Sequence, residues 1–370
     1  MAMKRLVMLE DLPSERIRSK EEEQCERIYE GTTYQNEKGR YVVQLPKRSG
    51  WQQLGDSKET ALKRFMAMER RRRLDSKLDH AYKAFMKEYR DLQHMSYLGT
   101  YAEINTNDSP LSYFLPHHAV WKADSTTTKC RVVFDASCKT SSGRSLNDVL
   151  LTGPQLQDDV VSIQLRFRMN LVALVADVEK MYRQILVEDN DKALQRILWR
   201  DDANEPIAVY ELNTVTYGTA CAPFLAIKTL QRIFDDHGSA YPKALTSKAD
   251  FYVDDLLSGA TTIREAQEMA RQLNKLLTYG GFSLRKWASN HPEALIDIPE
   301  EQRATNTQFE LAAEVKTIST LGLLWTPQTD MLQVQPQGEE QLNGNGYRYI
   351  NHYHNSNNNH EPNNQTSGHG

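Results

Sequence analysis

The chain has 370 residues, of which 39% are hydrophobic and 25% are charged. This composition is typical of a globular protein and excludes collagen-like and wholly disordered chains. The longest apolar run, Leu171 to Ala176, has six residues, far fewer than the ~20 that a membrane-spanning helix needs. The four cysteines include no C-x2-C pair, which argues against a zinc knuckle or a disulfide framework, so we expect a reducing, intracellular compartment.

The charge is distributed unevenly along the chain. Residues 1–100 hold 21 Lys and Arg against 16 Asp and Glu, whereas residues 101–370 hold 24 against 33. A net-acidic second part argues against non-specific adhesion to nucleic acid, which depends on neutralising phosphates. It remains compatible with a protein that grips nucleic acid locally and uses carboxylates to bind metal ions.

The first 100 residues predict a helical N-terminal extension. Residues 21–30 predict a solvated helix and residues 41–45 a strand. Two helices are expected between Ser57 and Gln93, with a break at 74–76, because apolar residues recur there every three or four positions. The run Arg70–Arg73 closes the first of these helices, where positive charge complements the helix dipole. Contact with phosphate is the alternative for this run.

Strands and helices alternate between Pro110 and Pro327, and turn formers at 201–206 indicate a β-hairpin. The predicted helices are 157–168, 223–237 and 263–279, and the predicted strands are 118–121, 130–135, 171–177, 196–199, 207–212, 250–253, 256–258 and 319–325. After Pro336 the chain is rich in Asn, Gly and His, a composition that cannot bury enough apolar surface to fold, and we predict disorder.

Two acidic features carry the chemistry. Asp254 and Asp255 follow the apolar run FYV, and neighbouring strand residues point to opposite faces. Both acids therefore serve one site only if the chain turns at this point. A tight β-hairpin with Asp254 and Asp255 at its tip would provide such a turn. The apolar strand Leu171–Val178 ends in Asp177. Three such carboxylates can hold two divalent ions for phosphoryl chemistry, whereas an Asp-Asp pair alone would indicate a polar turn.

These features resemble reverse transcriptases. Phe251–Asp255 (FYVDD) is similar to their central motif, and four more segments follow the family's order: 129–135, 177–182, 217–224 and 280–287. Leu321–Trp325 resembles the primer-grip hairpin. The local sequences LPHHAVWK, CRVVFDAS and GGFSLRKWASN are most similar to those of the BEL/Pao class of LTR retrotransposons. The resemblance covers roughly residues 30–333.

The resemblance implies an α+β fold, in which a right-hand polymerase palm has a small antiparallel sheet backed by helices. Residues 1–99 would be an N-terminal polyprotein linker with a helical pair, 100–335 the fingers and palm, and 336–370 a disordered tail. Within 100–335, the fingers would take 100–150 and 184–222. The implied function is RNA-directed DNA polymerisation by two-metal nucleotidyl transfer.

The same resemblance implies roles for single residues. The two Mg²⁺ ions, which Mn²⁺ could replace, would be bound by Asp177, Asp254, Asp255 and the carbonyl of Val178. The incoming nucleotide would be bound by Lys129 and Arg131 at the triphosphate, by Tyr182 under the sugar, and by Tyr217 and Gly218 in the pocket wall. Lys286 would protonate the leaving pyrophosphate.

The implied partners are an RNA or DNA template with its primer, deoxynucleoside triphosphates, and the rest of a Pol polyprotein or a partner subunit. The resemblance implies no binding to a membrane. The implied location is the cytoplasm or a virus-like particle. Because no protease, thumb or ribonuclease H pattern is present, we expect the chain to be a piece of a longer polyprotein. The alternative is a catalytically inactive or domesticated remnant that binds nucleic acid or protein. A nuclease that uses two metal ions is a second, weaker alternative.

Overall fold

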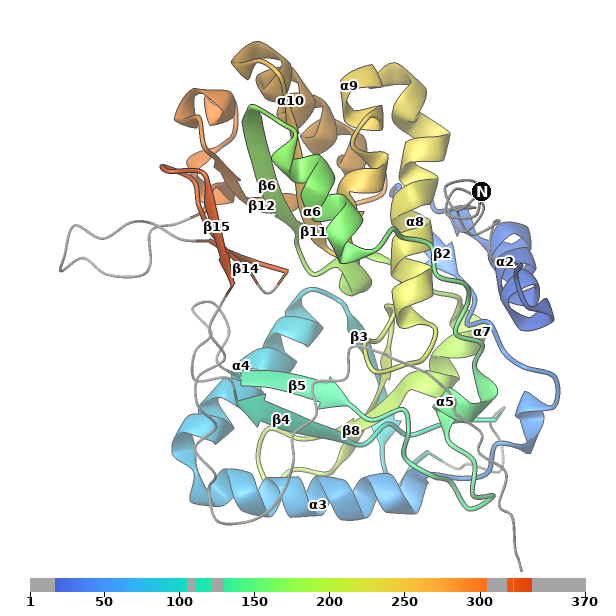
Figure 1. Cartoon of the computed structure of the whole chain (residues 1–370). Coiled ribbons are helices and arrows are strands. Elements are labelled where there is room, and N and C mark those ends of the chain that lie inside the picture. The colour runs from blue at the N-terminus through green and yellow to red at the C-terminus, as the bar shows by residue number, and fades with distance from the viewer. Residues whose placement is uncertain (1–16, 105–110, 122–129, 305–317, 322, 335–370) are drawn as a thin grey trace, which may run out of the picture. The chain divides into compact units, whose positions relative to one another are not determined.

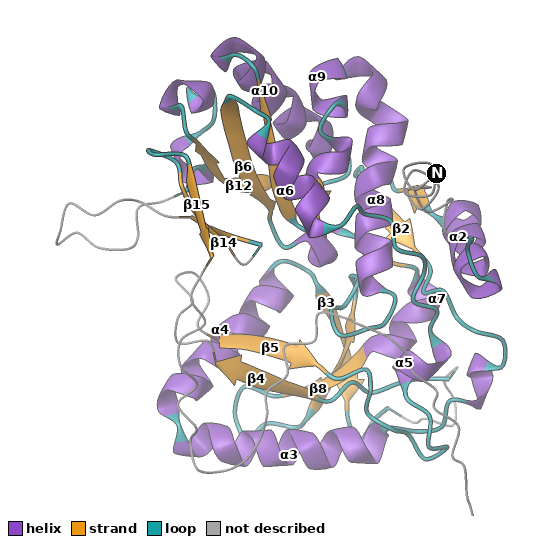
Figure 2. Cartoon of the chain, viewed as in Figure 1, coloured by secondary structure: helices purple, strands orange, loops and turns teal. Residues whose placement is uncertain are grey.

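The computed structural model describes residues 17–104, 111–121, 130–304, 318–321 and 323–334. Residues Met1–Gln333 form one compact unit and Val334–Gly370 a second. The predicted disordered tail and Lys129 lie outside the described residues. As predicted, the fold mixes helices with small sheets, most of them antiparallel (Figures 1 and 2). Among the described residues, no helix is long and apolar enough to cross a membrane.

The N-terminal segment is part of the folded core. Helix α2 (Lys20–Thr32) begins with a capping box between Ser19 and Glu22, which satisfies free backbone N–H groups at its start. We predicted a solvated helix, but Cys25 and Tyr29 on its inner face are fully buried. After β1 (Tyr34–Gln35), strand β2 (Tyr41–Val43) pairs in parallel with β7 (Leu186–Val187). The segment that we predicted as a linker therefore contributes a helix and a sheet strand to the compact unit.

We expect Tyr29→Phe to lower the free energy of unfolding by about 1.5 kcal/mol, because it leaves the buried hydroxyl of Thr229 without a partner. The hydroxyls of Tyr29 and Thr229 are 2.9 Å apart and join α2 to helix α8 (Ala222–His237). Urea unfolding of both proteins measures the difference. Tyr97→Phe, at a side chain that is 59% exposed, is the control and should change stability by less than ~0.5 kcal/mol. Equal effects of the two substitutions would contradict the packing of α2.

The two predicted helices of residues 57–93 are confirmed as α3 (Lys58–Leu74) and α4 (Ser76–Asp91). Between them, the carboxylate of Asp75 accepts the Leu78 N–H at 3.0 Å and caps α4. Arg72, in the middle of the arginine run, is buried, pairs with Asp79 at 2.8 Å and stacks over the Trp199 ring at 4.2 Å. Arg72 therefore holds the two helices and strand β8 (Arg196–Trp199) together and is not available to phosphate.

Two small sheets follow in the chain. Strands β4 (His117–Trp121) and β5 (Cys130–Phe134) form an antiparallel pair. Strand β8 (Arg196–Trp199) pairs with β9 (Ala208–Leu212) across the predicted hairpin at 201–206, which is confirmed. The third strand of that sheet, β3 (Met95–Thr100), was not predicted. Its burial pattern has three consecutive exposed residues, in place of the alternation that marks a half-buried strand.

A four-stranded antiparallel sheet of order β10-β11-β6-β12 carries the acidic motifs. Its strands are β10 (Phe251–Tyr252), β11 (Asp255–Ala260), β6 (Val172–Val178) and β12 (Leu284–Ser289). Because side chains alternate along a strand, Ala173 and Val175 pack with α6 (Val160–Arg168), whereas Val172, Leu174 and Ala176 join the main core. Helices α8 and α10 (Ile263–Thr278) supply much of that core. Both faces of β6 are thus buried, which explains its nearly continuous apolar sequence.

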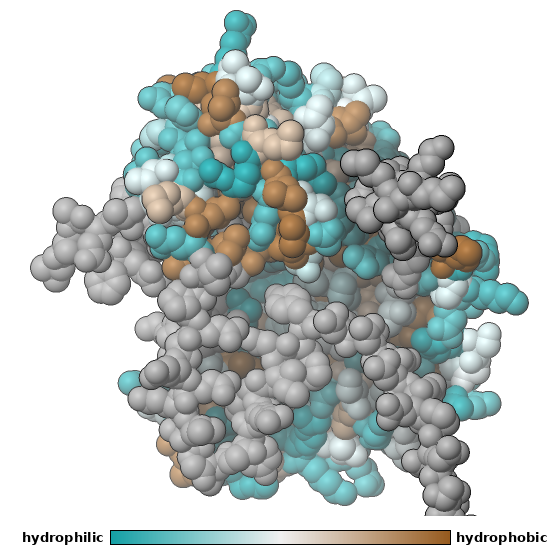
Figure 3. Space-filling view, viewed as in Figure 1, coloured by the Kyte–Doolittle hydropathy of each residue, from teal (hydrophilic) through white to brown (hydrophobic). Residues whose placement is uncertain are grey.

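Helix α6 buries only one side. Ile163 and Phe167 pack toward the sheet, whereas Val161, Leu165 and Met169 are between 62% and 82% exposed. The face of the molecule that carries α6 accordingly shows several apolar patches among polar ones (Figure 3).

Short elements complete the described fold. They are the helices α5 (Leu146–Val149), α7 (Asp189–Lys192) and α9 (Pro242–Leu245), and the strands β13 (Ile318–Thr320), β14 (Leu323–Thr326) and β15 (Met331–Val334). We predicted one strand over 319–325, but the chain turns at Leu321, which has a φ of +48°, and β13 pairs back on β14. Trp325 of β14 is fully buried against Phe167 of α6, with ring centroids 5.4 Å apart.

Candidate catalytic site

The strand register brings two of the predicted acids face to face. In the antiparallel pair of β6 and β11, Asp177 lies directly opposite Asp255. Directly paired residues of neighbouring strands lie on the same face of a sheet, and two like charges there are destabilising. The repulsion between Asp177 and Asp255 destabilises the fold, and a destabilising pair of this kind is typical of a functional site.

The third acid lies in the turn that joins β10 to β11. Tyr252 pairs with Asp255, so Val253 and Asp254 form a two-residue connection. We predicted both acids at the hairpin tip, but only Asp254 is there, and Asp255 begins the returning strand. The carbonyl of Asp254 accepts the N–H of Val178, the last residue of β6, at 2.7 Å. This bond ties the turn to the strand end that carries Asp177.

Burial and mutual repulsion disfavour the charged forms of two of these acids. Burial raises the pKa of Asp255 to about 7, and the nearby charges of Asp254 and Asp177 add to this effect. Burial and the charge of Asp177 also raise the pKa of Asp254, although Lys286 and Arg131 partly offset the rise. Clustered carboxylates with raised pKa values mark candidate catalytic groups.

Lys286 reaches the acids from the other neighbouring strand. Its φ of +55° and the register shift between Arg285 and Ala288 show that β12 is irregular at this point. The Nζ atom of Lys286 donates to Asp177 Oδ2 at 3.1 Å, and the lysine side chain is 54% exposed. The predicted lysine and the predicted aspartate are therefore in direct contact.

The donor set suits a hard divalent cation in its chemistry, because carboxylate oxygens are the ligands that Mg²⁺ prefers. In the described parts of the chain, however, no three His, Cys, Asp or Glu side chains are gathered closely enough to hold one ion. One oxygen of Asp177 bonds Lys286 instead. Metal binding here thus requires the carboxylates to turn toward one another, and a cation would compete with Lys286 for Asp177. The roles of Asp177, Val178, Asp254 and Asp255 as ligands stay a prediction.

Arg131 projects from β5 as an exposed residue whose charge acts on both Asp254 and Tyr217. The Tyr217 hydroxyl donates to the Val132 carbonyl at 2.6 Å, and its ring lies 5.6 Å from that of Phe134. Tyr217 thus fastens its loop to β5. A Cβ atom on Gly218, which has a φ of +98°, would lie 2.3 Å from the Phe134 carbonyl oxygen. The close backbone approach that this glycine allows is therefore to β5, and its contact with a nucleotide remains a prediction.

Tyr182 lies in the 3-10 turn Met181–Gln184, directly after β6, where it is half-buried against the main core. Residues that we did not predict as functional hold this turn. The guanidinium of Arg40 donates to the carbonyls of Arg183 and Gln184 at 2.8 and 2.9 Å. Arg183 donates to His94 at 2.8 Å and pairs with Glu88 of α4 at 2.8 Å. Burial and the charge of Arg183 lower the pKa of His94 to about 3, so the ring stays neutral and accepts this bond.

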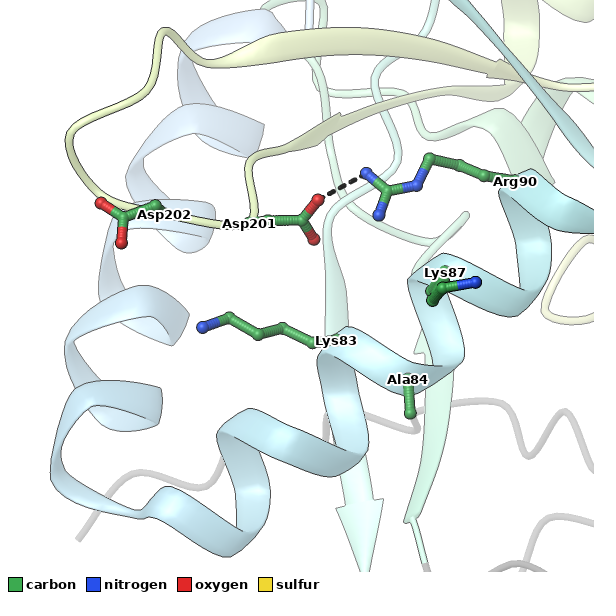
Figure 4. Close-up of a pocket in the computed structure, with 6 residues that line it drawn as sticks. All are labelled: Lys83, Ala84, Lys87, Arg90, Asp201 and Asp202. Atoms are coloured by element: carbon green, nitrogen blue, oxygen red, sulfur yellow. Dashed lines mark hydrogen bonds and ion pairs between the residues drawn. The ribbon is translucent and has the colours of Figure 1, made fainter.

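A separate hollow of about 380 Å³ lies beside α4 (Figure 4). It is lined by Lys83, Ala84, Lys87, Arg90, Asp201 and Asp202. Arg90 bonds Asp201 at 2.6 Å, and the two lysines pair with acids of α4 itself. Since its cations are already neutralised and it contains none of the predicted site residues, this hollow is not the candidate site.

Comparisons with known proteins found no matching family model and no matching curated protein. Among solved structures, the chain is similar to the foamy viral protease-reverse transcriptase in complex with an RNA/DNA hybrid. The identity is 12% and the TM-score 0.46, over 71% of this chain and 27% of that one. A structure of the foamy viral protease-reverse transcriptase dRH in complex with double-stranded DNA matches at 12% identity and a TM-score of 0.37, over 57% and 32% of the two chains. The chain thus spans about a third or less of these proteins, and TM-scores below 0.5 do not establish a shared fold.

Proposed function

We propose that the chain is the fingers and palm portion of a reverse transcriptase of the BEL/Pao type and catalyses RNA-directed DNA synthesis. The observation that carries this proposal is the pairing of Asp177 with Asp255 across two strands, with Asp254 in the adjoining turn. Two carboxylates paired across the sheet and a third in the adjoining turn, two of them with raised pKa values, supply the type and number of groups that phosphoryl transfer with two divalent ions uses.

In this proposal the acids Asp177, Asp254 and Asp255 hold two Mg²⁺ ions, with the Val178 carbonyl as a further ligand. Bound Mg²⁺ would lower the pKa of a primer 3′-hydroxyl and offset charge on the leaving phosphate. Release of Lys286 from Asp177 would free its ammonium group to give a proton to the departing pyrophosphate.

The proposed nucleotide contacts come from three other elements. Arg131 on β5 would bind the triphosphate, since a guanidinium matches phosphate geometry, and Lys129 would assist it. Tyr182 would lie beneath the sugar. Tyr217 and Gly218 would form part of the pocket wall through the loop that they fasten to β5.

Primer extension on an RNA template with Mg²⁺ tests the function. We expect addition of the nucleotide complementary to the template. Because residues 101–335 hold 23 Lys and Arg against 30 Asp and Glu, phosphate contacts should be few. Products formed under a heparin trap should then be short and disappear as salt rises. Template binding without extension would favour the inactive remnant, and cleavage of the template without extension would favour a nuclease.

We expect Tyr182→Ala to raise the use of ribonucleotides relative to deoxynucleotides at least tenfold, while some deoxynucleotide use remains. The physical reason is that removal of the ring opens space for a 2′-hydroxyl beneath the sugar. The measurement is the ratio of kcat/KM values for the two nucleotides. Tyr210→Ala, at an aromatic residue on β9, is a control that should leave the ratio unchanged. An unchanged ratio in Tyr182→Ala would mean that the ring only packs against the core.

A further inference from the structure

The turn that carries Asp254 lacks the residue types that favour its backbone conformation. Val253 has a φ of +54°, a backbone conformation that is an outlier for a β-branched residue. Two-residue hairpin turns usually place Gly, Asn or Asp at such positions. A strained turn of this kind persists only when the surrounding structure holds it.

Gln157 provides this support. Its Nε2 donates to the Phe251 carbonyl at 3.0 Å, and its Oε1 accepts the Val253 N–H at 3.1 Å. Strand β10 is the edge of the four-stranded sheet, so no strand of the described residues pairs with the backbone groups of its outer side. One side-chain amide supplies both a donor and an acceptor to residues two apart, as a neighbouring strand would.

The position of Gln157 is itself determined by its neighbours. We predicted it inside a helix, but α6 begins at Val160, and Gln157 lies in the preceding loop. The carbonyl of Leu156, one residue before it, accepts from Gln231 of α8 at 3.0 Å. Two residues after it, Asp159 caps α6 by accepting the Ser162 N–H. The amide therefore reaches the hairpin from a backbone that is anchored on both sides.

A second contact from the same segment holds the base of the hairpin. Arg166 of α6 donates to the Ala249 carbonyl at 2.6 Å and to Asp250 Oδ1 at 3.2 Å. Asp250 in turn accepts from Ser258 Oγ of β11 at 2.6 Å. With the hairpin held at its base by Arg166 and near its tip by Gln157, the turn residue Asp254 has a defined place beside β6.

We propose that Gln157 is a positioning residue, whose amide holds the Phe251–Asp255 hairpin in the conformation that sets Asp254 and Asp255 against Asp177. The effect on catalysis rests on the proposed function, whereas the effect on the hairpin does not. Loss of the amide would release the strained Val253 and let the turn move away from β6, so the acids would lose their alignment while the core stays packed.

The test compares Gln157→Ala, Gln157→Glu and the control Gln164→Ala. Gln164 is a glutamine of α6 for which no hydrogen bond to the described part of the hairpin is found. Amide hydrogen exchange of Val253 is the activity-independent measurement. Gln157→Ala should exchange at least tenfold faster than the parent protein, and Gln164→Ala at the parent rate. Gln157→Glu retains the acceptor for the Val253 N–H but loses the donor to Phe251, so its rate should lie between them.

Single-nucleotide addition is the second measurement. In Gln157→Ala, kcat should fall at least tenfold, with KM for the nucleotide and the melting temperature little changed, and Gln157→Glu should be affected less. Val253 exchange at the parent rate in Gln157→Ala would overturn the proposal. So would faster exchange with an unchanged kcat. A parent chain that folds but adds no nucleotide would contradict the proposed function instead, and the exchange rates would still decide whether Gln157 holds the hairpin.

Discussion

Replacing Asp254 by Asn is expected to reduce template-directed nucleotide addition at least 100-fold while the protein stays folded. The substitution removes the charge of one of the three carboxylates that are proposed to hold the metal ions. Single-nucleotide addition with Mg²⁺ measures the effect. Asp297→Asn, at an exposed residue outside the site, is the control and should retain full activity. Activity of Asp254→Asn close to that of the parent chain would show that this acid does not belong to the catalytic centre.

The same carboxylates make stability depend on pH in a defined direction. The pKa of Asp255 is about 7 in the folded chain, well above the ~3.9 of an unfolded aspartate. Between these values the folded state binds more protons than the unfolded state, so stability falls as pH rises from about 4 to 7. Without divalent ions, Asp255→Asn should therefore raise the melting temperature by a few degrees at pH 8 and leave it nearly unchanged at pH 4. A lower melting temperature at pH 8 would contradict the repulsion inferred here.

Gly218→Ala is expected to destabilise the fold strongly. The new Cβ would lie 2.3 Å from the Phe134 carbonyl oxygen, and the φ of +98° is itself unfavourable for alanine. Overpacking typically costs 1–3 kcal/mol and positive-φ strain about 1–2 kcal/mol, so we expect a loss of about 3 kcal/mol or more in the free energy of unfolding.

Gly143→Ala is the matched control for this substitution. Gly143 also has a positive φ, of +76°, but nothing lies within 4 Å of its added Cβ. It should therefore lose only the strain contribution, about 1–2 kcal/mol. Chemical unfolding of the two variants isolates the contact with β5, and losses of equal size would contradict it.

The elements that carry the acids could be predicted because their signals are local. Strand β6 has a nearly continuous apolar sequence, and the FYV and LL runs on either side of Asp254 and Asp255 indicate a hairpin. Helices α3 and α4 and the break between them could be predicted from apolar spacing alone, whereas the cap that Asp75 provides was found only in the structure. Which acid occupies the turn could not be predicted, because a shift of one residue in register exchanges the two.

The supports of the site could not be predicted, because they depend on contacts between residues far apart in the chain. Gln157 and Phe251 are 94 residues apart, and Arg40 and Arg183 are 143 residues apart. The sequence around Gln157, between Leu156 and Asp158, has no local pattern that separates a hairpin support from a solvated loop. The burial of Arg72 could not be predicted from the sequence for the same reason, because its partner Trp199 lies on a strand far away in the chain.

The proposed function is tested most directly by single-nucleotide addition to a DNA primer annealed to a defined RNA template, at low salt and with enzyme in excess. These conditions remove any dependence on processivity. We expect that only the complementary deoxynucleotide is added, that Mg²⁺ is required, and that Asp177→Asn abolishes addition. A folded chain that binds the template–primer but adds no nucleotide with either Mg²⁺ or Mn²⁺, or an Asp177→Asn variant as active as its parent, would contradict the proposed function.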